Sequence, residues 1–226
     1  MKPDIFVTVD VVIFALRHGD QQNQQDLQVL LVKRQFPPFE NTWAIPGGYV
    51  IPAESLEDAA KRVLREETDV QGVHIEQLFT FGDIERDPRG RTVTVAYFAI
   101  VPAPLAIHPG RGATEAQWQS VYGLPEMGFD HAEIVHYALK RLRNKLEYSA
   151  VGFQFLPPEF TLSSLQHAYE TVLGEKLDKR NFRRRILQND VIEETSNMQM
   201  GDGRPAKLYR FKMDAVAEVK ARRLFP

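Results

Sequence analysis

Apolar residues recur in two patterns along the 226-residue chain. Short runs rich in Val, Ile and Phe, bounded by polar turn residues, are typical of strands. Such runs occur at 5–15, 27–33, 73–81 and 92–101. Apolar residues that recur every three or four positions predict amphipathic helices. These helices begin near residues 56, 130, 162 and 179. The mixture of strands and helices predicts an α+β protein.

The helix that begins near residue 56 has a well-defined start and an unusual end. Ser55 can cap its first turn, and Asp58, three residues later, can hydrogen-bond back to Ser55 as in a capping box. Its apolar side consists of Leu56, Ala60, Val63 and Leu64. Glu66 and Glu67 occupy the last turn, where the helix dipole disfavours acidic side chains. This acidic pair indicates a nearby cation or ligand, and a solvated helix end is the alternative interpretation.

The chain divides into two predicted domains. Residues 1–148 form the first domain, which ends with a helix whose N-cap is Asp130. Residues 149–158 form a linker, and its two prolines favour an extended joint over a continuous helix. Residues 159–226 form the second domain, which begins with a helix capped by Thr161.

One helix of the second domain concentrates positive charge. Asp178 caps this helix, which runs over residues 179–189. Its basic residues are Lys179, Arg180, Arg183, Arg184 and Arg185. At about 100° per residue, Phe182 and Ile186 point towards the domain core. The opposite side presents Arg180, Arg184 and Gln188.

A predicted hairpin follows the basic helix, with strands at 191–195 and 207–211. Helix, short turn, basic helix and hairpin occur in this order in winged helix-turn-helix domains, which bind DNA. We expect Arg180 and Arg184 to contact base edges. We expect phosphate contacts from Lys179, Arg183, Arg185, Arg204 and Lys207. A basic helix that merely faces solvent is the alternative.

Composition and charge narrow the class of protein. Hydrophobic content of 43% and charged content of 26% are typical of a soluble globular protein. The sequence contains no cysteine, which excludes disulfides and thiol chemistry. It shows neither a secretory signal nor an apolar run of about 20 residues, so we expect a cytoplasmic protein without membrane contact. Residues 1–150 carry 15 Lys and Arg against 20 Asp and Glu, whereas residues 151–226 carry 13 against 10. This asymmetry favours a polyanion partner for the second domain.

Two loops of the first domain contain candidate ligand-binding residues. Arg34 and Trp43 flank a Pro-Pro segment with neighbouring aromatic residues, which is typical of either a packing corner or a stacking surface. Arg86, Arg89 and Arg91 lie on a turn-rich loop between two strands. Arginines in this setting can bind a diphosphate in bidentate fashion. Ion pairs within the same loop are the alternative. His108, His131 and His136 show no metal-ligand spacing and are interpreted as structural.

The segment from Gly48 to Val70 resembles the signature of the Nudix hydrolases. The positions that match the signature are Gly48, Glu54, Arg62, Leu64, Glu66, Glu67 and Val70. Val63 and Asp69 depart from it, because the family has a glutamate and a glycine there. The resemblance implies a Nudix α/β/α sandwich domain with ligand contacts from Gly48, Glu54 and Glu67. The loop around Arg34 and Trp43 borders the nucleotide in similar Nudix proteins, and the loop of Arg86, Arg89 and Arg91 resembles the ADP-ribose subgroup.

Val63 is the departure with a chemical consequence. Nudix enzymes use the acidic cluster to bind a divalent metal that polarises a pyrophosphate and activates water. A valine supplies neither a ligand oxygen nor a base. We therefore expect ligand binding with weakened or lost hydrolysis and no catalytic residues. Glu66 and Glu67 are then vestigial metal ligands, and Mg²⁺ is a possible but not a required cofactor.

Both domains together are similar to the bacterial Nudix-related transcriptional regulators of NAD metabolism. The resemblance implies a homodimeric repressor of NAD synthesis or salvage genes, with ADP-ribose as its effector. A symmetric dimer is expected to bind double-stranded DNA at an inverted-repeat operator. The alternative is an active ADP-ribose pyrophosphatase with an accessory C-terminal domain, because Glu54, Glu66 and Glu67 are all present.

Overall fold

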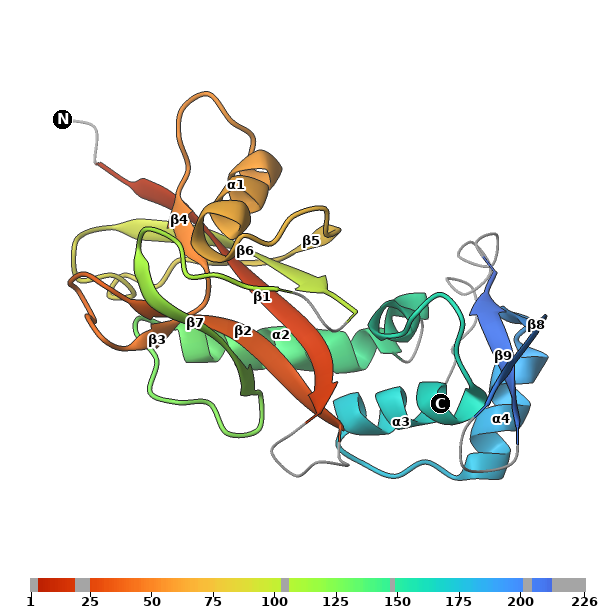
Figure 1. Cartoon of the computed structure of the whole chain (residues 1–226). Helices are drawn as coiled ribbons and strands as arrows, with labels where there is room; N and C mark the ends of the chain where they lie inside the picture. The colour runs from red at the N-terminus through yellow and green to blue at the C-terminus, as the bar shows by residue number, and fades with distance from the viewer. Residues whose placement is uncertain (1–3, 19–24, 103–105, 147–148, 201–204, 213–226) are drawn as a thin grey trace.

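The computed structural model describes residues 4–18, 25–102, 106–146, 149–200 and 205–212. Figure 1 shows a sheet between two helices, followed by a smaller helical unit with its own hairpin. The mixed sheet and the C-terminal helix–helix–hairpin unit confirm the predicted α+β class. Within the described residues, no helix combines the length and the apolar character that crossing a bilayer requires.

The main sheet is built around β1 (Phe6–His18). Its strand order is β3 (Trp43–Ala44), β2 (Gln25–Arg34), β1, β6 (Thr92–Ile100) and β5 (Ile75–Phe81), while β4 (Gly47–Tyr49) pairs with β1 and β7 (Ala113–Ser120) pairs with β2. Only β1 and β6 run parallel among these pairs; the other pairs are antiparallel. Strands β1, β2, β5 and β6 were predicted, whereas β3, β4 and β7 were not. These three lack the dense apolar run that identifies a buried strand from sequence.

The two faces of β1 explain the sandwich. Val11 and Ile13 belong to an apolar cluster with α1 (Leu56–Thr68), whereas Val12 and Phe14 pack in a second cluster with α2 (His131–Leu146). Successive residues of a strand point to opposite faces, so both faces of β1 are apolar and each is covered by one helix. The predicted α/β/α arrangement is therefore confirmed.

Helix α1 begins and ends as its sequence directs. The Ser55 side chain accepts a hydrogen bond of 3.1 Å from the backbone N–H of Asp58. Asp69 ends the helix in the left-handed conformation, with φ of 61°, and its N–H donates to the Arg65 carbonyl. Asp tolerates this conformation better than most non-glycine residues. The replacement of the signature glycine by Asp69 is thus compatible with the same helix end.

The second domain has the predicted order of elements. Helix α3 (Leu162–Leu173) is capped by Thr161, and helix α4 (Lys179–Gln188) by Asp178. Strands β8 (Ile192–Gln199) and β9 (Ala206–Phe211) form the hairpin. The backbone of β9 also pairs with Phe160 through Tyr209, which attaches the hairpin to the start of α3.

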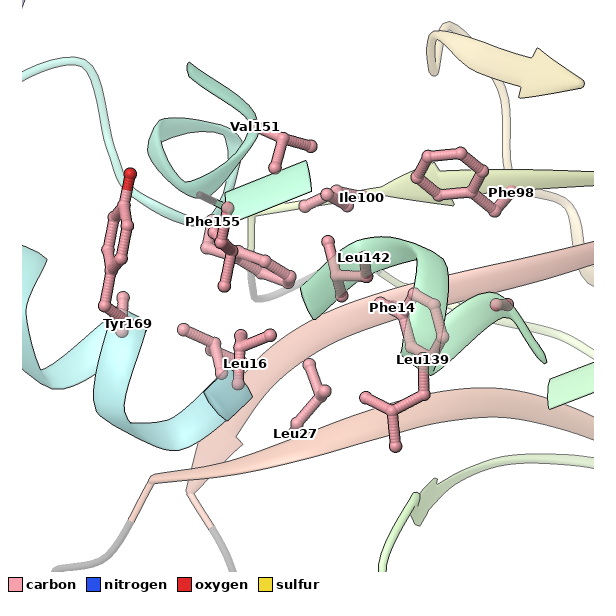
Figure 2. Close-up of a cluster of buried hydrophobic side chains, with 14 of the residues drawn as sticks. Phe14, Leu16, Leu27, Phe98, Ile100, Leu139, Leu142, Val151, Phe155 and Tyr169 are labelled. Atoms are coloured by element: carbon pink, nitrogen blue, oxygen red, sulfur yellow. The ribbon is translucent and has the colours of Figure 1, made fainter. Parts of the chain in front are cut away.

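The linker differs from the predicted extended joint. Residues Ala150–Phe155 form a 3-10 helix, η1, in which Val151, Phe153 and Phe155 are buried; the backbone becomes extended only at Leu156. Figure 2 shows apolar side chains of β1, β2, β6, α2, η1 and α3 in one cluster. Apolar side chains in the linker are buried on both domains, which stabilises the 3-10 helix. This helix ends at Phe155, and Leu156, the residue before Pro157, has the extended backbone that a following proline favours. The two domains therefore share a continuous core.

Candidate ligand cavity and nucleic-acid interface

A polar cavity of about 180 Å³ lies where β1, β2 and β4 meet the start of α2 and the end of α1. Its lining comprises Thr8, Asp10, Val32, Arg34, Ala44, Ile45, Gly47, Gly48, Tyr49, Glu67, Arg86, Asp87, Arg89, Gly112, Phe129 and His131. Five of the predicted ligand residues are among these, namely Arg34, Gly48, Glu67, Arg86 and Arg89. The cavity is thus a candidate ligand site of the first domain.

Two arginines meet around one aromatic ring in this cavity. The guanidinium carbons of Arg34 and Arg89 lie 4.9 and 5.5 Å from the centre of the Phe129 ring, and that of Arg89 lies 5.4 Å from the Tyr49 ring. Burial and the positive charge of Arg89 lower the pKa of Arg34. Both guanidiniums are therefore close together in a partly desolvated place, which favours a bound anion. Phe129 adopts a left-handed φ of 56° in this arrangement.

Glu67 is one of three acidic residues of the cavity, with Asp10 and Asp87. Burial raises the pKa of its carboxyl group, while the positive charge of Arg34 opposes this rise. A Cβ atom at Gly112 would lie 3.1 Å from a Glu67 carboxylate oxygen, so the backbone at Gly112 packs closely against the Glu67 carboxylate. Glu67 thus faces the cavity from the end of α1, as the resemblance implied.

Arg86 is buried and bound to acidic residues rather than displayed on the loop surface. Its Nε and Nη2 atoms donate to the Asp130 carboxylate at 2.8 and 2.7 Å, and Nη2 lies 3.5 Å from an oxygen of Asp10. The Asp130 backbone carbonyl accepts from the Ile134 N–H at 3.1 Å. Asp130 therefore occupies the predicted N-cap position of α2, but its carboxylate binds Arg86.

His131 lies in the cavity wall next to this network. Its Nδ1 atom accepts a hydrogen bond of 3.2 Å from the Ile45 N–H, so Nε2 carries the proton and lies 3.6 Å from Asp10. Burial lowers the pKa of His131, against the opposing effect of Asp10. The imidazole is neutral in this environment. His131 therefore lines the cavity, in addition to the structural role that was predicted for it.

Three predicted ligand residues lie outside the cavity. Trp43 pairs with Met127 and packs on the main core; because side chains alternate along β3, its neighbour Ala44 faces the cavity instead. Glu54 binds Arg62, whose hydrogen bond lowers the Glu54 pKa to about 2. Arg91 donates to backbone carbonyls of its own loop. These three residues therefore do not line this cavity.

The acidic residues of the Nudix signature are dispersed. Glu66 accepts a hydrogen bond of 2.9 Å from Arg62 on the outer side of α1, whereas Glu67 faces the cavity. Val63 is 2% exposed and lies beneath Gly48, where an added Cβ would approach it to 3.0 Å. Within the described part of the chain, no group of three or more His, Cys, Asp and Glu side chains is suited to binding a metal ion. The side chains present therefore do not fit the metal site that the Nudix fold implies.

The sequence did not single out several cavity residues that the structure reveals. They are Thr8, Asp10, Tyr49, Asp87, Phe129 and His131. A signal was present for the first two, because Thr8 and Asp10 are polar residues on one face of a strand that is otherwise apolar. The others come from loops and element ends, and no local pattern shows which side chains of such segments converge.

Helix α4 has the predicted two sides. Phe182 and Ile186 are buried, while the exposed side presents Lys179, Arg180, Arg184 and Gln188. Arg183 and Arg185 are half-buried, and Arg183 donates to the Ser163 hydroxyl of α3 at 3.2 Å. The exposed basic side lies opposite the core, which is the arrangement of a helix that can enter the major groove.

The hairpin carries fewer free charges than the sequence indicated. The Lys207 ammonium lies 2.8 Å from a carboxylate oxygen of Glu194, and this hydrogen bond raises the pKa of Lys207. Arg210 is paired with Glu193 in the same way. Arg204 lies outside the described residues. A phosphate contact from Lys207 would therefore have to compete with Glu194.

Helix α2 connects the cavity to the second domain. Asp130 and His131 stand at its start, beside the cavity. Near its other end, Arg143 Nε donates to the Val172 carbonyl of α3 at 2.9 Å. The Tyr122 hydroxyl donates to the neighbouring Thr171 carbonyl at 2.6 Å. These carbonyls belong to the last turn of α3, where intrahelical partners are missing, so the first domain completes the end of this helix.

The sandwich with its modified signature helix defines a Nudix domain, and the C-terminal unit that is fused to it is a winged helix domain. The chain matches the NUDIX domain family over residues 7–138 and the NrtR DNA-binding winged helix domain over residues 152–211. It is 36% identical, over 93% of its own length and 84% of the relative's, to a protein of Acinetobacter baylyi named "ADPR responsive transcriptional repressor NtrR". The chain belongs to the NrtR family of Nudix-related regulators.

Two solved structures of Shewanella oneidensis NrtR are similar to this chain. The complex with a 27mer DNA has a TM-score of 0.76 and 35% identity, and the match covers 96% of each chain. The NUDIX domain complexed with ADP ribose has a TM-score of 0.54 and 36% identity, over 62% of this chain and 89% of that one. A relative that matches nearly the whole chain has therefore been observed with DNA. A relative of the first domain has been observed with ADP ribose.

Proposed function

We propose that this protein is an ADP-ribose-responsive transcriptional repressor of genes for NAD synthesis or salvage. The first domain binds ADP-ribose, the second binds operator DNA, and the ligand changes the affinity for the operator. The names of the Acinetobacter relative and of the Shewanella complexes support this assignment. We retain the division into residues 1–148, 149–158 and 159–226 as ligand domain, linker and DNA-binding domain.

The observation that carries this proposal is the path of α2. Its first residues line the cavity, and its last turns pack against η1 and α3 in one core. Figure 1 shows α2 running from the sheet towards the second domain. A rigid helix that touches both sites lets a ligand at one end displace the DNA-binding helices at the other, because packed interfaces change between discrete arrangements.

The arginine pair supports a diphosphate ligand. Arg34 and Arg89 share the Phe129 ring. Arg89 forms a bidentate ion pair with Asp87, and Arg34 donates to the Pro38 and Phe36 carbonyls. A diphosphate would use the remaining donors of the two guanidiniums or replace these partners. Burial, and then the positive charge of Arg89, lower the pKa of Arg34, and a bound anion would offset both effects. We assign the diphosphate of ADP-ribose to these two residues.

The site favours binding over hydrolysis. Val63 provides no ligand atom one turn before Glu67, and Glu66 is turned away to Arg62. We therefore infer a regulator without catalytic residues, in which Mg²⁺ is not required. An ADP-ribose pyrophosphatase with an accessory domain is the competing function; no arrangement of side chains in the described residues favours it.

DNA binding is assigned to the exposed side of α4. One winged helix per chain recognises a short half-site, so a homodimer bound to an inverted repeat is the expected assembly. We assign base-edge contacts to Arg180 and Arg184, and phosphate contacts to Lys179, Arg183, Arg185, Arg204 and Lys207.

A paired experiment tests the proposal against its alternative. Gel shifts on DNA upstream of NAD genes, with and without ADP-ribose, measure operator binding, and a hydrolysis assay with ADP-ribose and Mg²⁺ measures turnover. We expect a ligand-dependent shift and turnover near background. Arg184→Ala is the matched variant, because it should lose the shift but keep ADP-ribose binding. Turnover at ordinary enzyme rates of about 1–10³ s⁻¹ without any specific shift would establish the hydrolase instead.

A further inference from the structure

Asp10 lies in the cavity with most of its hydrogen-bonding capacity unused. Its side chain is 6% exposed, and its polar neighbours make only long contacts with it, Arg86 Nη2 at 3.5 Å and His131 Nε2 at 3.6 Å. Arg86 gives its two short hydrogen bonds to Asp130 instead. A buried carboxylate normally accepts several good hydrogen bonds, because an unsatisfied buried charge is costly. Asp10 therefore has acceptor positions available for a ligand.

Thr8 offers a second polar group beside Asp10. The two residues are two positions apart on β1, so they share one face of the strand, and both line the cavity. The Thr8 Oγ1 atom is buried and has no hydrogen-bond partner among the described residues. A buried hydroxyl without a partner is uncommon, and Thr8 is a lining residue of a polar cavity. Asp10 and Thr8 thus form a polar corner of the cavity whose hydrogen-bonding capacity is largely unused.

The backbone opposite Asp10 is arranged to admit this carboxylate. Gly47 of β4 is the register partner of Asp10, and a Cβ at Gly47 would lie 1.9 Å from the Asp10 Oδ1 atom. Any larger residue at position 47 would displace the carboxylate. The glycine therefore keeps the Asp10 carboxylate against β4 at the cavity wall.

The charges and size of the cavity indicate which chemical group fits this corner. Asp10 accepts hydrogen bonds from neutral donors, and it repels the phosphates that Arg34 and Arg89 attract. The volume of about 180 Å³ is below the roughly 300–1,000 Å³ of sites that enclose a whole drug-sized ligand, so the cavity encloses only the part of the ligand that adjoins the diphosphate at Arg34 and Arg89. A pentose with neighbouring hydroxyl groups fits, because two O–H groups can donate to one carboxylate.

We propose that Asp10 and Thr8 bind the hydroxyl groups of a sugar attached to the diphosphate, which in ADP-ribose is the terminal ribose. This subsite rests on the proposed function, since it names which part of the ligand enters the cavity. It makes the site selective for a nucleotide sugar over the corresponding nucleoside diphosphate.

Calorimetry with ADP-ribose and with ADP tests the subsite on the full-length protein. The wild-type protein should bind ADP-ribose at least about tenfold more tightly than ADP. Asp10→Asn and Thr8→Val should each weaken ADP-ribose binding, by about ten- to a hundredfold for the charged group, and leave ADP binding nearly unchanged. Thr94→Val is the matched control: Thr94 is the register partner of Thr8 and is buried with an unpartnered hydroxyl, but it does not line the cavity.

The outcomes separate this subsite from the proposed function. A wild-type protein that binds neither ligand would contradict the proposed function itself. A wild-type protein that binds both equally, or variants at 8 and 10 that bind ADP-ribose as the wild type does, would overturn the subsite alone. An effect of Asp10→Asn that appears only with Mg²⁺ and not with EDTA would make Asp10 a cation ligand and would also overturn it. If Asp10→Asn does not fold, Thr8→Val and the wild-type ligand comparison still decide.

Discussion

Arg86 and Asp130 lie 44 positions apart in the chain and form a bidentate ion pair, with hydrogen bonds of 2.7 and 2.8 Å. The pair connects the loop between β5 and β6 to the start of α2. The Arg86 side chain is 4% exposed, so water does not screen this contact. A ligand that changes the surroundings of Arg86 thereby acts directly on the helix that reaches the second domain.

Loss of this pair should destabilise the protein strongly. Arg86→Ala leaves the Asp130 and Asp10 carboxylates without their buried cation, and breaking a buried pair costs about 3–5 kcal/mol in the free energy of unfolding. Urea denaturation measures this change. Lys61→Ala is the control, because Lys61 forms a solvent-exposed pair with Glu57 that water screens, so its loss should change the stability little. Equal effects of the two substitutions would contradict the assigned role of Arg86.

The hydrogen bonds from the first domain to the end of α3 should carry the ligand response. Tyr122→Phe removes the donor to the Thr171 carbonyl, and Arg143→Ala removes the donor to the Val172 carbonyl. Both sites remain intact, so ADP-ribose affinity should be unchanged, while the coupling, typically about 1–3 kcal/mol, should decrease. Operator binding measured with and without ADP-ribose gives the coupling.

Tyr137→Phe provides the matched control for this experiment. Tyr137 also lies on α2, but its ring stacks on Phe79 away from the joint. The coupling should be the same as in the wild type. If Tyr122→Phe and Arg143→Ala both keep full coupling, the response takes another route.

Residues of α4 should differ in how they affect DNA binding. Arg184→Ala removes an exposed side chain opposite the Phe182–Ile186 core face and should cost about 1–3 kcal/mol on the operator, with relaxed preference at one position per half-site. Lys179→Ala should weaken operator and scrambled DNA alike and lower the salt slope by about one unit per lost contact. Salt-dependent fluorescence anisotropy measures both. The opposite pattern would exchange the two roles.

The stability of the protein should depend on pH through His131. Burial lowers the pKa of His131 below its ordinary value of 6.5. In the window below 6.5, the unfolded chain therefore binds a proton that the folded protein does not bind. The free energy of unfolding consequently decreases as the pH falls through this window. Above the window, the protein keeps the full stability that neutral His131 allows.

Urea denaturation at pH 7.5 and pH 5 measures this dependence. His131→Asn is the matched variant, because its side-chain oxygen can accept the hydrogen bond from the Ile45 N–H but does not titrate. The difference in stability between the two pH values should be smaller in the variant than in the wild type. The same difference in both proteins would show that other groups cause the pH dependence.

Local sequence patterns were sufficient for the α-helices, for strands β1, β2, β5 and β6, for the C-terminal hairpin and for the order of the two domains, but not for β3, β4, β7 and η1. Strands such as β1 and β6 and helices such as α1, α3 and α4 form from neighbouring residues whose apolar spacing and capping residues are directly visible. The exposed side of α4 was predictable for the same reason, since helical periodicity alone separates Phe182 and Ile186 from Arg180 and Arg184.

The composition of the cavity was decided by tertiary structure. Arg86, Arg89 and Arg91 look equivalent in the sequence, but Asp130, the Phe129 ring and backbone carbonyls place them in three different environments. Contacts between segments many residues apart, such as Asp10 with Gly47, determine which side chains meet, and local propensity carries no information on such contacts. The linker became a buried 3-10 helix for the same reason: its apolar side chains are buried between the domains, and the helix ends before the two prolines.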